Sequence, residues 1–188
     1  MVRLSAAAAV VFLSMAAQTG TAWDTHSKAP PDGGLDSDLV TIAALQDAVA
    51  DAWQNMPLTQ RKVAFVTADP ISYGSYDERR SNVFRPGEKI ITYVEPIGFT
   101  WAKNSDSTFR YGLSVDMLVK RSDGKILEGQ AKVVDLVKNS HVRNQELMLV
   151  LSLSLNDVEA DDYVVEYTLH DSQSNKTSKF SKNFTLQR

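Results

Sequence analysis

The segment LMLVLSLSL at residues 147–155 carries leucine at every second position. Beyond Val150 the intervening residues are Ser152 and Ser154, so one face is apolar and the other suits water. This alternation predicts a β-strand with one buried face, because successive side chains point to opposite faces of a strand. Residues 113–119 and 163–169 alternate in the same way. We therefore expect a mainly β protein.

Polar turns separate the expected strands. Asp123-Gly124 stands between two alternating runs and is typical of a tight hairpin. No segment of helical period lies between the strands, which argues against a parallel α/β sheet. Two antiparallel sheets packed face to face would bury the apolar stripes. We predict a β-sandwich of about seven strands over residues 61–188, near 62–67, 89–95, 113–119, 125–137, 147–155, 163–169 and 178–187.

One amphipathic helix is predicted at residues 39–56. Apolar residues recur there at spacings of three and four, with Trp53 as the largest, and Pro57 ends the pattern. The helix can pack on its own domain or on a partner, and the spacing is the same in both cases. The residues before it, 23–38, are rich in proline, glycine, aspartate and serine and are predicted to form a flexible linker.

Residues 1–22 have the pattern of a secretory signal peptide. Arg3 precedes an apolar run at residues 4–17, and Gly20-Thr21-Ala22 supplies small residues for cleavage after Ala22. The run is too short for a membrane-spanning helix, which needs about 20 residues. We expect export to the bacterial periplasm or the medium, with no transmembrane segment left after cleavage.

Composition narrows the class of protein. The chain has 188 residues, no cysteine and a formal net charge of -3. The absence of cysteine excludes a disulfide scaffold, a cysteine-ligated metal site and a cysteine nucleophile. A negative charge argues against nucleic-acid binding, which needs a basic surface.

No catalytic constellation is found in the sequence. The three histidines, His26, His141 and His170, stand outside any known catalytic spacing, and each is expected to be an ordinary surface residue. Carboxylates at residues 157–162 lack the spacing of a calcium loop. We therefore predict a protein that is not an enzyme and has no metal site and no cofactor.

Two loops are the candidate partner-binding surface. Residues 72–80 hold Tyr73, Tyr76, Arg79 and Arg80, and residues 95–101 hold Phe99 and Trp101. Tyrosine and arginine often anchor protein interfaces, because they combine apolar area with directional hydrogen bonds. The alternative is that Phe99, Trp101 and Tyr76 pack in the core or along a sheet edge.

Two segments resemble one fold family. Val83-Phe-Arg-Pro-Gly-Glu88 precedes an alternating strand, and Ala160-Asp-Asp-Tyr-Val-Val-Glu-Tyr167 resembles a tyrosine-corner strand in which Tyr163 bonds back to the preceding connection. Phe180 and Phe184 resemble a closing hairpin. Over residues 62–188 the chain is similar to uncharacterised bacterial secreted proteins with an immunoglobulin-like or fibronectin type III-like β-sandwich. The resemblance implies an antiparallel sandwich of that kind and no particular activity.

Three functions compete at this stage. The first is a non-enzymatic module that binds a protein of the cell envelope through the two loops, with the helix as an added docking face. The second is a carbohydrate-binding module in which Trp101 and Tyr76 stack on sugar rings. The third is a hydrolase with a dispersed site, such as His170 with Asp171 and a nearby serine. The oligomeric state is left open.

Overall fold

The computed structural model describes residues 7–9 and 33–187. Helix α1 (Gly33–Asn55) precedes nine strands, and β1 (Ala7–Ala9) lies ahead of it. The nine strands are β2 (Thr59–Val66), β3 (Val83–Phe84), β4 (Ile90–Ile97), β5 (Ala102–Lys103), β6 (Phe109–Arg121), β7 (Ile126–Ser140), β8 (Leu149–Leu153), β9 (Asp162–Asp171) and β10 (Thr177–Leu186). The mainly β prediction is confirmed. The strand number is nine rather than about seven, because the two-residue strands β3 and β5 are too short to show alternation.

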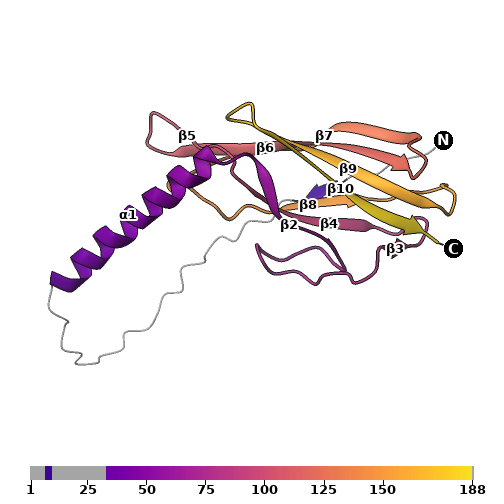
Figure 1. The fold of residues 1–188 in the computed structure, drawn as a ribbon, viewed down its shortest axis with the longest axis horizontal. Coiled ribbons are helices and arrows are strands. Elements are labelled where there is room, and N and C mark those ends of the chain that lie inside the picture. The colour runs from indigo at the N-terminus through magenta and orange to yellow at the C-terminus, as the bar shows by residue number, and fades with distance from the viewer. Residues whose placement is uncertain (1–6, 10–32, 188) are drawn as a thin grey trace, which may run out of the picture.

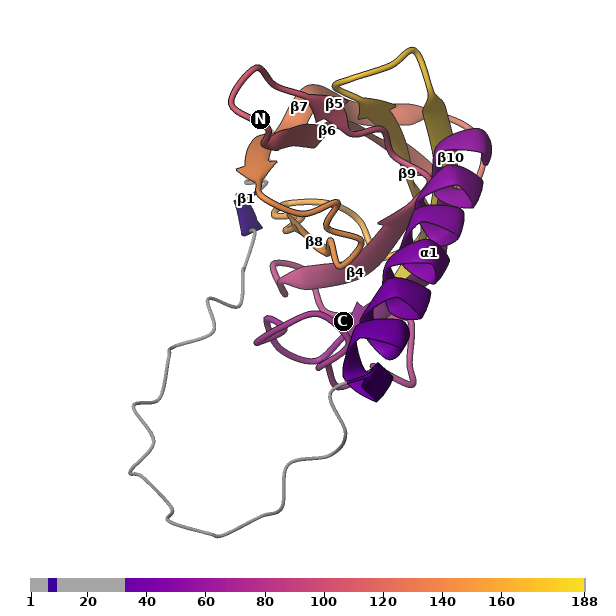
Figure 2. The same cartoon turned by 90° about the vertical axis from the view of Figure 1, so that its left-hand side faces the viewer.

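The strands form two sheets that face one another (Figure 1). The first sheet has the order β1-β8-β4-β2, and all of its pairs are antiparallel. The second has the order β3-β10-β9-β6-β5, with β7 also paired to β6. Its one parallel pair is β3 with β10, where Val83 lies opposite Thr185. Figure 2 shows β4 and β8 on one side of the interior and β6 and β7 on the other. The architecture agrees with the predicted β-sandwich.

The alternating stripes of the sequence form the core between the sheets. Leu149, Leu151 and Leu153 point inward from β8 and belong to one buried cluster with the inward residues of the other sheet. Burying apolar side chains gives about 1.5–3 kcal/mol for each one, which makes this cluster the main source of stability. The inward residues of the second sheet are Leu113, Val115, Met117, Val119, Tyr163, Val165, Tyr167, Leu169, Phe184 and Leu186.

The outer face of β8 is covered, contrary to the expectation that its serines face water. Ser152 is only 8% exposed, and all five residues of β8 are buried. Val150 packs on this outer side with Val66, Ile91 and Tyr93, and Tyr73 from the connection between β2 and β3 lies against them. A long connection folded over the sheet is not visible in strand periodicity, so the sequence does not predict this second layer.

Tight turns hold the strands in register. At the predicted hairpin between β6 and β7, Gly124 has a φ of 87°, a conformation that favours glycine. The Asp123 carboxylate accepts a hydrogen bond from the amide of Lys125 at 2.8 Å. The hairpin prediction is confirmed by these contacts.

Helix α1 begins before its predicted start at residue 39, so residues 33–38 of the predicted linker are helical. No proline stands between Pro31 and Pro57, and the carboxylate of Asp36 suits the positive end of the helix dipole. The helix ends at Asn55, just before Pro57, as expected. It projects from one end of the sandwich (Figure 1).

Strand β1 falls inside the predicted signal peptide. It pairs with β8 in the antiparallel sense, with Ala8 opposite Leu151. The remainder of residues 1–22 and residues 23–32 of the predicted linker lie outside the described residues. Within residues 7–9 and 33–187, no helix has the length and apolar character needed to cross a bilayer.

Candidate interaction site

The first predicted loop folds back on the sandwich. Tyr76 stacks on Tyr93 of β4, with ring centroids 4.2 Å apart. The Tyr93 hydroxyl donates to Glu95 Oε1 at 2.7 Å and accepts from the amide of Gly74 at 2.8 Å. Burial raises the pKa of the Tyr93 hydroxyl, and the nearby Glu95 carboxylate adds to this effect. Tyr73 and Tyr76 are therefore half-buried residues that attach the loop to the outer face of the first sheet.

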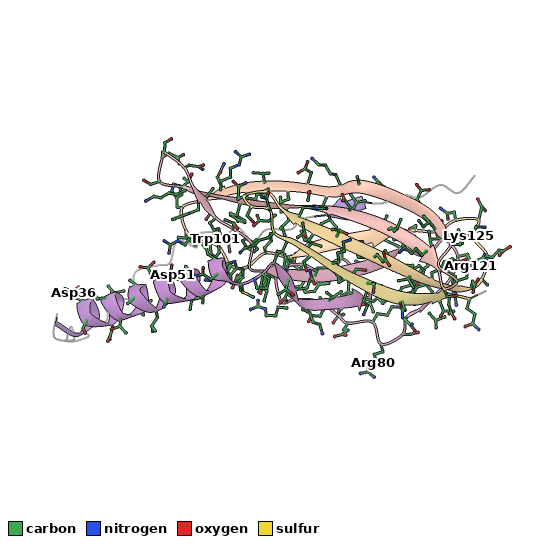
Figure 3. All side chains as sticks on the ribbon, turned by 45° about the horizontal axis from the view of Figure 1, so that its top comes forward. Asp36, Asp51, Arg80, Trp101, Arg121 and Lys125 are labelled. Carbon is green, nitrogen blue, oxygen red and sulfur yellow. The ribbon has the colours of Figure 1, made fainter. Side chains whose placement is uncertain are left out.

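Arg79 closes the same loop. Its guanidinium donates to Glu88 Oε1 and to the carbonyl oxygen of Val83, both at 2.7 Å. The group also lies over the Phe84 ring, 4.2 Å from the centroid, where a cation–π contact adds to the hydrogen bonds. Arg80 is exposed and points away from the molecule (Figure 3). The two arginines thus differ, because Arg79 is engaged within the fold and only Arg80 is directed at solvent.

Phe99 and Trp101 lie in the core. Phe99 is 0% exposed and Trp101 is 5% exposed, so neither can line a surface. Trp101 stacks on Trp53 of α1 at 5.5 Å between ring centroids, and Phe99 stacks on Tyr111 at 5.7 Å. The two loops therefore do not form one exposed aromatic surface. Phe99 and Trp101 therefore follow the alternative expectation that they pack in the core, because the C-terminal end of α1 covers the loop that carries them.

Among the described residues, helix α1 contacts the sandwich through its C-terminal half. Ala50 and Trp53 are buried, and the indole N–H of Trp53 donates to the carbonyl oxygen of Phe99 at 2.9 Å. Lys176 Nζ donates to the carbonyl oxygen of Gln54 at 2.7 Å. A positive charge at this position is favourable, because the C-terminal end of a helix carries a partial negative charge. Arg143 Nη1 contacts Asp47 Oδ1 at 2.8 Å.

The rest of α1 exposes apolar side chains. Leu39 and Leu45 are each 62% exposed, Ile42 is 50% exposed and Val49 is 48% exposed. Residues three and four apart share one side of a helix, so Leu39, Ile42 and Val49 continue the side that Trp53 buries. Figure 3 shows this part of the helix extending away from the sandwich, from Asp51 to Asp36. Several large apolar residues gathered on one helix face are typical of an interaction surface. We call Leu39, Ile42, Leu45 and Val49 the helix stripe.

The charge of α1 is of one sign. Its charged residues are Asp36, Asp38, Asp47 and Asp51, and residues 33–55 contain no lysine or arginine. Beside the C-terminal half of α1 lies a hollow of about 540 Å³. Its apolar lining residues are Ala50, Phe109 and Val142, and its polar ones are Gln46, Asp47, Arg143, Asn144, Gln145 and Glu146. Val142 is itself exposed at the rim of this hollow. The four aspartates of α1 favour a neutral or basic binding partner over an acidic one.

A polar cluster on the outer face of the second sheet was not predicted. His170 Nε2 lies 2.8 Å from Asp116 Oδ2, and the amide of Lys132 donates to Asp116 Oδ1 at 2.9 Å. Lys132 has a φ of 53° in an irregular part of β7, which turns its amide toward the carboxylate. The pKa of the Asp116 carboxyl lies below its ordinary value, chiefly because of the Lys132 amide and further because of His170. The alternation of the sequence places the side chains of Asp116 and His170 on the outer face of the sheet. Only the register of β6 against β9 brings the two side chains together.

The contacts of Asp171 do not support the hydrolase arrangement. Its carboxylate is buried and accepts hydrogen bonds from the amides of Thr100 and Gln173 and from the Ser174 hydroxyl. His170 bonds to Asp116 instead. Neighbouring residues of a strand face opposite sides, so His170 and Asp171 are separated by the sheet.

The carboxylates considered for calcium bind an arginine. Arg121 contacts Glu159 Oε2 at 2.6 Å and Asp161 Oδ2 at 3.0 Å. Within the described part of the chain, no three histidine, aspartate or glutamate side chains are grouped so that they could hold a metal ion. The chain matches no protein-family model, and no curated protein sequence matches it.

Proposed function

We propose that this protein is a non-enzymatic interaction module that docks on a protein partner through helix α1. The observation that carries the proposal is the helix stripe, whose four apolar side chains are about half exposed or more on a helix fixed at one end. A soluble protein gains stability by burying such residues, so their exposure is accounted for by a partner that covers them. The loop residues Tyr73, Tyr76 and Arg79 support the scaffold, and Arg80 stays an exposed candidate contact.

We further propose that the scaffold is an immunoglobulin-like sandwich. Two features support this, and both lie in the second sheet. The parallel pairing of β3 with β10 puts a short early strand beside the last one. The Tyr163 hydroxyl donates to the carbonyl oxygen of Glu159 at 2.7 Å, which is the bond expected of a tyrosine corner. Nuclear Overhauser contacts between Val83 and Thr185 in solution would test the strand order.

The proposed location is the bacterial periplasm or the medium, and the support is the pattern of residues 1–22. Mass spectrometry of the protein recovered outside the cytoplasm tests it directly. The expected chain begins at Trp23. A recovered chain that retains residues 1–22 would contradict the proposal.

The docking role is tested by size-exclusion chromatography of extracts from the producing cells. The wild-type protein is expected to elute in a complex larger than one chain. A Leu39→Asp, Leu45→Asp variant is expected to elute as a single chain, because a buried unpaired carboxylate is strongly unfavourable. A Ser37→Asp, Ala44→Asp variant is the matched control, since it adds the same charge on the side of the helix away from the stripe. Elution of the wild type as a single chain would contradict the docking role.

The structure does not expose the aromatic rings on which the carbohydrate-binding alternative depended. It relied on Trp101 and Tyr76 stacking on sugar rings, and Trp101 lies under the helix while Tyr76 stacks on Tyr93. We therefore do not propose sugar binding through these residues.

A further inference from the structure

Strand β8 lies at an edge of the first sheet, where the short strand β1 is its outer neighbour. Ala8 of β1 stands opposite Leu151, and the antiparallel pairing covers residues 150–152 of β8. Strand β1 belongs to residues 1–22, which have the pattern of a signal peptide, so cleavage after Ala22 removes it. The backbone N–H and C=O groups on the outer side of residues 150–152 then lack their partner strand, and β8 becomes an open edge.

The other edge strands carry features that hinder the addition of a further strand. Strand β2 carries Arg61 and Lys62, and its register with β4 shifts between Gln60 and Lys62. Strand β7 carries charges of both signs and has two irregular places in its pairing with β6. Strand β10, which only the two-residue strand β3 covers, carries Lys179 and Lys182. Charges and bulges at a sheet edge oppose pairing with another chain.

Strand β8 has none of these features. Residues 147–155 contain no charged residue and no proline. The pairing of β8 with β4 runs from Leu149 to Leu153 without a shift in register. A regular, apolar edge strand of this kind is a template for another strand. A strand that covers this edge in the exported protein accounts for its lack of protection.

We infer that β8 of the exported protein binds one extended segment of a different protein in the place of β1. This inference rests on the proposed export with cleavage after Ala22. The segment adds to the first sheet antiparallel to β8, and main-chain hydrogen bonds supply the affinity. The three alanines of β1 and the uncharged sequence of β8 favour a segment of small or apolar residues without charge.

Two other occupants fit this edge less well. Residues 23–32 of the same chain contain two adjacent prolines, which cannot donate hydrogen bonds to a neighbouring strand. A second copy of the chain would bring the edge of a whole sandwich. Strand β1 lies next to β7 of the second sheet as well as β8 (Figure 2). A strand at this place borders both sheets, which favours a single extended segment.

Hydrogen exchange resolved by NMR tests the open edge in the exported protein, with the full chain of residues 1–188 as the reference. Amides of residues 150–152 that point away from β4 are expected to exchange at least about tenfold faster in the exported protein, because no strand covers them. A synthetic peptide of residues 3–13 is the probe. Its addition is expected to restore slow exchange in a saturable manner.

The matched control is the same peptide with Ala7→Pro and Ala8→Pro. Successive N–H groups of a strand point to opposite sides, so one of these two donates toward β8, and proline removes that donor. The control peptide is expected to leave the exchange fast. Slow exchange in the exported protein without peptide, no effect of the wild-type peptide, or an equal effect of the two peptides would overturn the inference.

Photo-crosslinking in the producing cells identifies the occupant. Ser154 is partly exposed just after β8, and a crosslinking amino acid at this position is expected to attach to a different protein. The attached segment, mapped by mass spectrometry, is expected to be an uncharged run of small or apolar residues. Position 61 on the charged edge of β2 is the control and should give no such adduct. An adduct of two identical chains, an adduct with a charged segment, or no adduct at position 154 would overturn the inference.

The mass of the recovered protein separates this inference from the proposed function. A recovered chain that retains residues 1–22 contradicts the proposed export and this inference together. A chain that begins at Trp23 and still protects the outer amides of β8 overturns this inference and leaves the export standing. The docking role of α1 is independent of both results, because it is tested by the charge variants of the helix stripe.

Discussion

The indole nitrogen of Trp53 donates a hydrogen bond of 2.9 Å to the carbonyl oxygen of Phe99, across 46 positions of the chain. This bond joins the last turns of α1 to the connection between β4 and β5. It fixes the direction in which the helix leaves the sandwich. The exposed part of α1 is therefore presented by a rigid base rather than by a free tail.

Replacing Trp53 with alanine is expected to lower the free energy of unfolding by about 3–5 kcal/mol, as for other large aromatic truncations in cores. The loss combines contacts to Trp101 and Phe99 with the lost hydrogen bond. Urea denaturation followed by circular dichroism measures it. Trp53→Phe keeps an aromatic ring without the N–H and should lose less. An unchanged midpoint for Trp53→Ala would show that α1 is not attached as described.

Tyr163→Phe removes the hydroxyl that donates to the carbonyl oxygen of Glu159. One such hydrogen bond contributes about 0.5–1.5 kcal/mol to stability, so the variant should lose that amount. Tyr73→Phe is the matched control, because within the described residues the buried Tyr73 hydroxyl has no hydrogen-bond partner. Thermal unfolding of the two variants compares them. A larger loss of stability for Tyr73→Phe than for Tyr163→Phe would contradict this prediction.

Arg79→Ala is expected to lower the free energy of unfolding by about 1–3 kcal/mol, because it removes the donor to the Val83 carbonyl oxygen and to Glu88 Oε1. The loop at residues 67–82 should also become easier to cleave by a protease. Arg80→Ala changes an exposed side chain of the same type and should have little effect on either measurement. Similar cleavage rates for the two variants would contradict the role given to Arg79.

Asp116 makes stability depend on pH in a defined direction. The pKa of its carboxyl is lower in the folded protein than its ordinary value, chiefly because of the amide of Lys132. Such a group stabilises the fold above the unfolded-chain pKa, about 3.9, and this contribution disappears as the pH falls through the lower folded value. Both Asp116 and His170 are partly exposed, so solvent screening keeps the contribution below about 1 kcal/mol.

Asp116→Asn tests this contribution. The variant should be slightly less stable than the wild type at pH 7, and the difference should vanish at acid pH below the folded pKa. Chemical denaturation at a series of pH values measures the two curves. A difference that grows toward acid pH would have the wrong sign for a carboxyl with a lowered pKa.

The strands were predictable because one of their faces meets the core. Leu149, Leu151 and Leu153 alternate in the sequence and are buried together. The helix was also predictable, because its apolar residues recur every three or four positions, whereas those of the strands recur every two. The strands β3 and β5 were not, because two residues carry no period.

The candidate site was predictable only in part. The sequence gives α1 an apolar side but leaves open whether that side is covered. Phe99 and Trp101 have the composition of an interface, yet the end of α1 packs on them and removes them from the surface. Asp116 and His170 are far apart in the chain and meet only through the register of β6 and β9.

Periodicity in the sequence by itself determined that this chain forms a helix followed by paired strands with one apolar face, because alternation reports which way each side chain points. Only the tertiary structure decided which apolar residues stay exposed. That outcome depends on contacts between distant segments, and these bury Trp53 and leave Ile42 half exposed on the same side of α1.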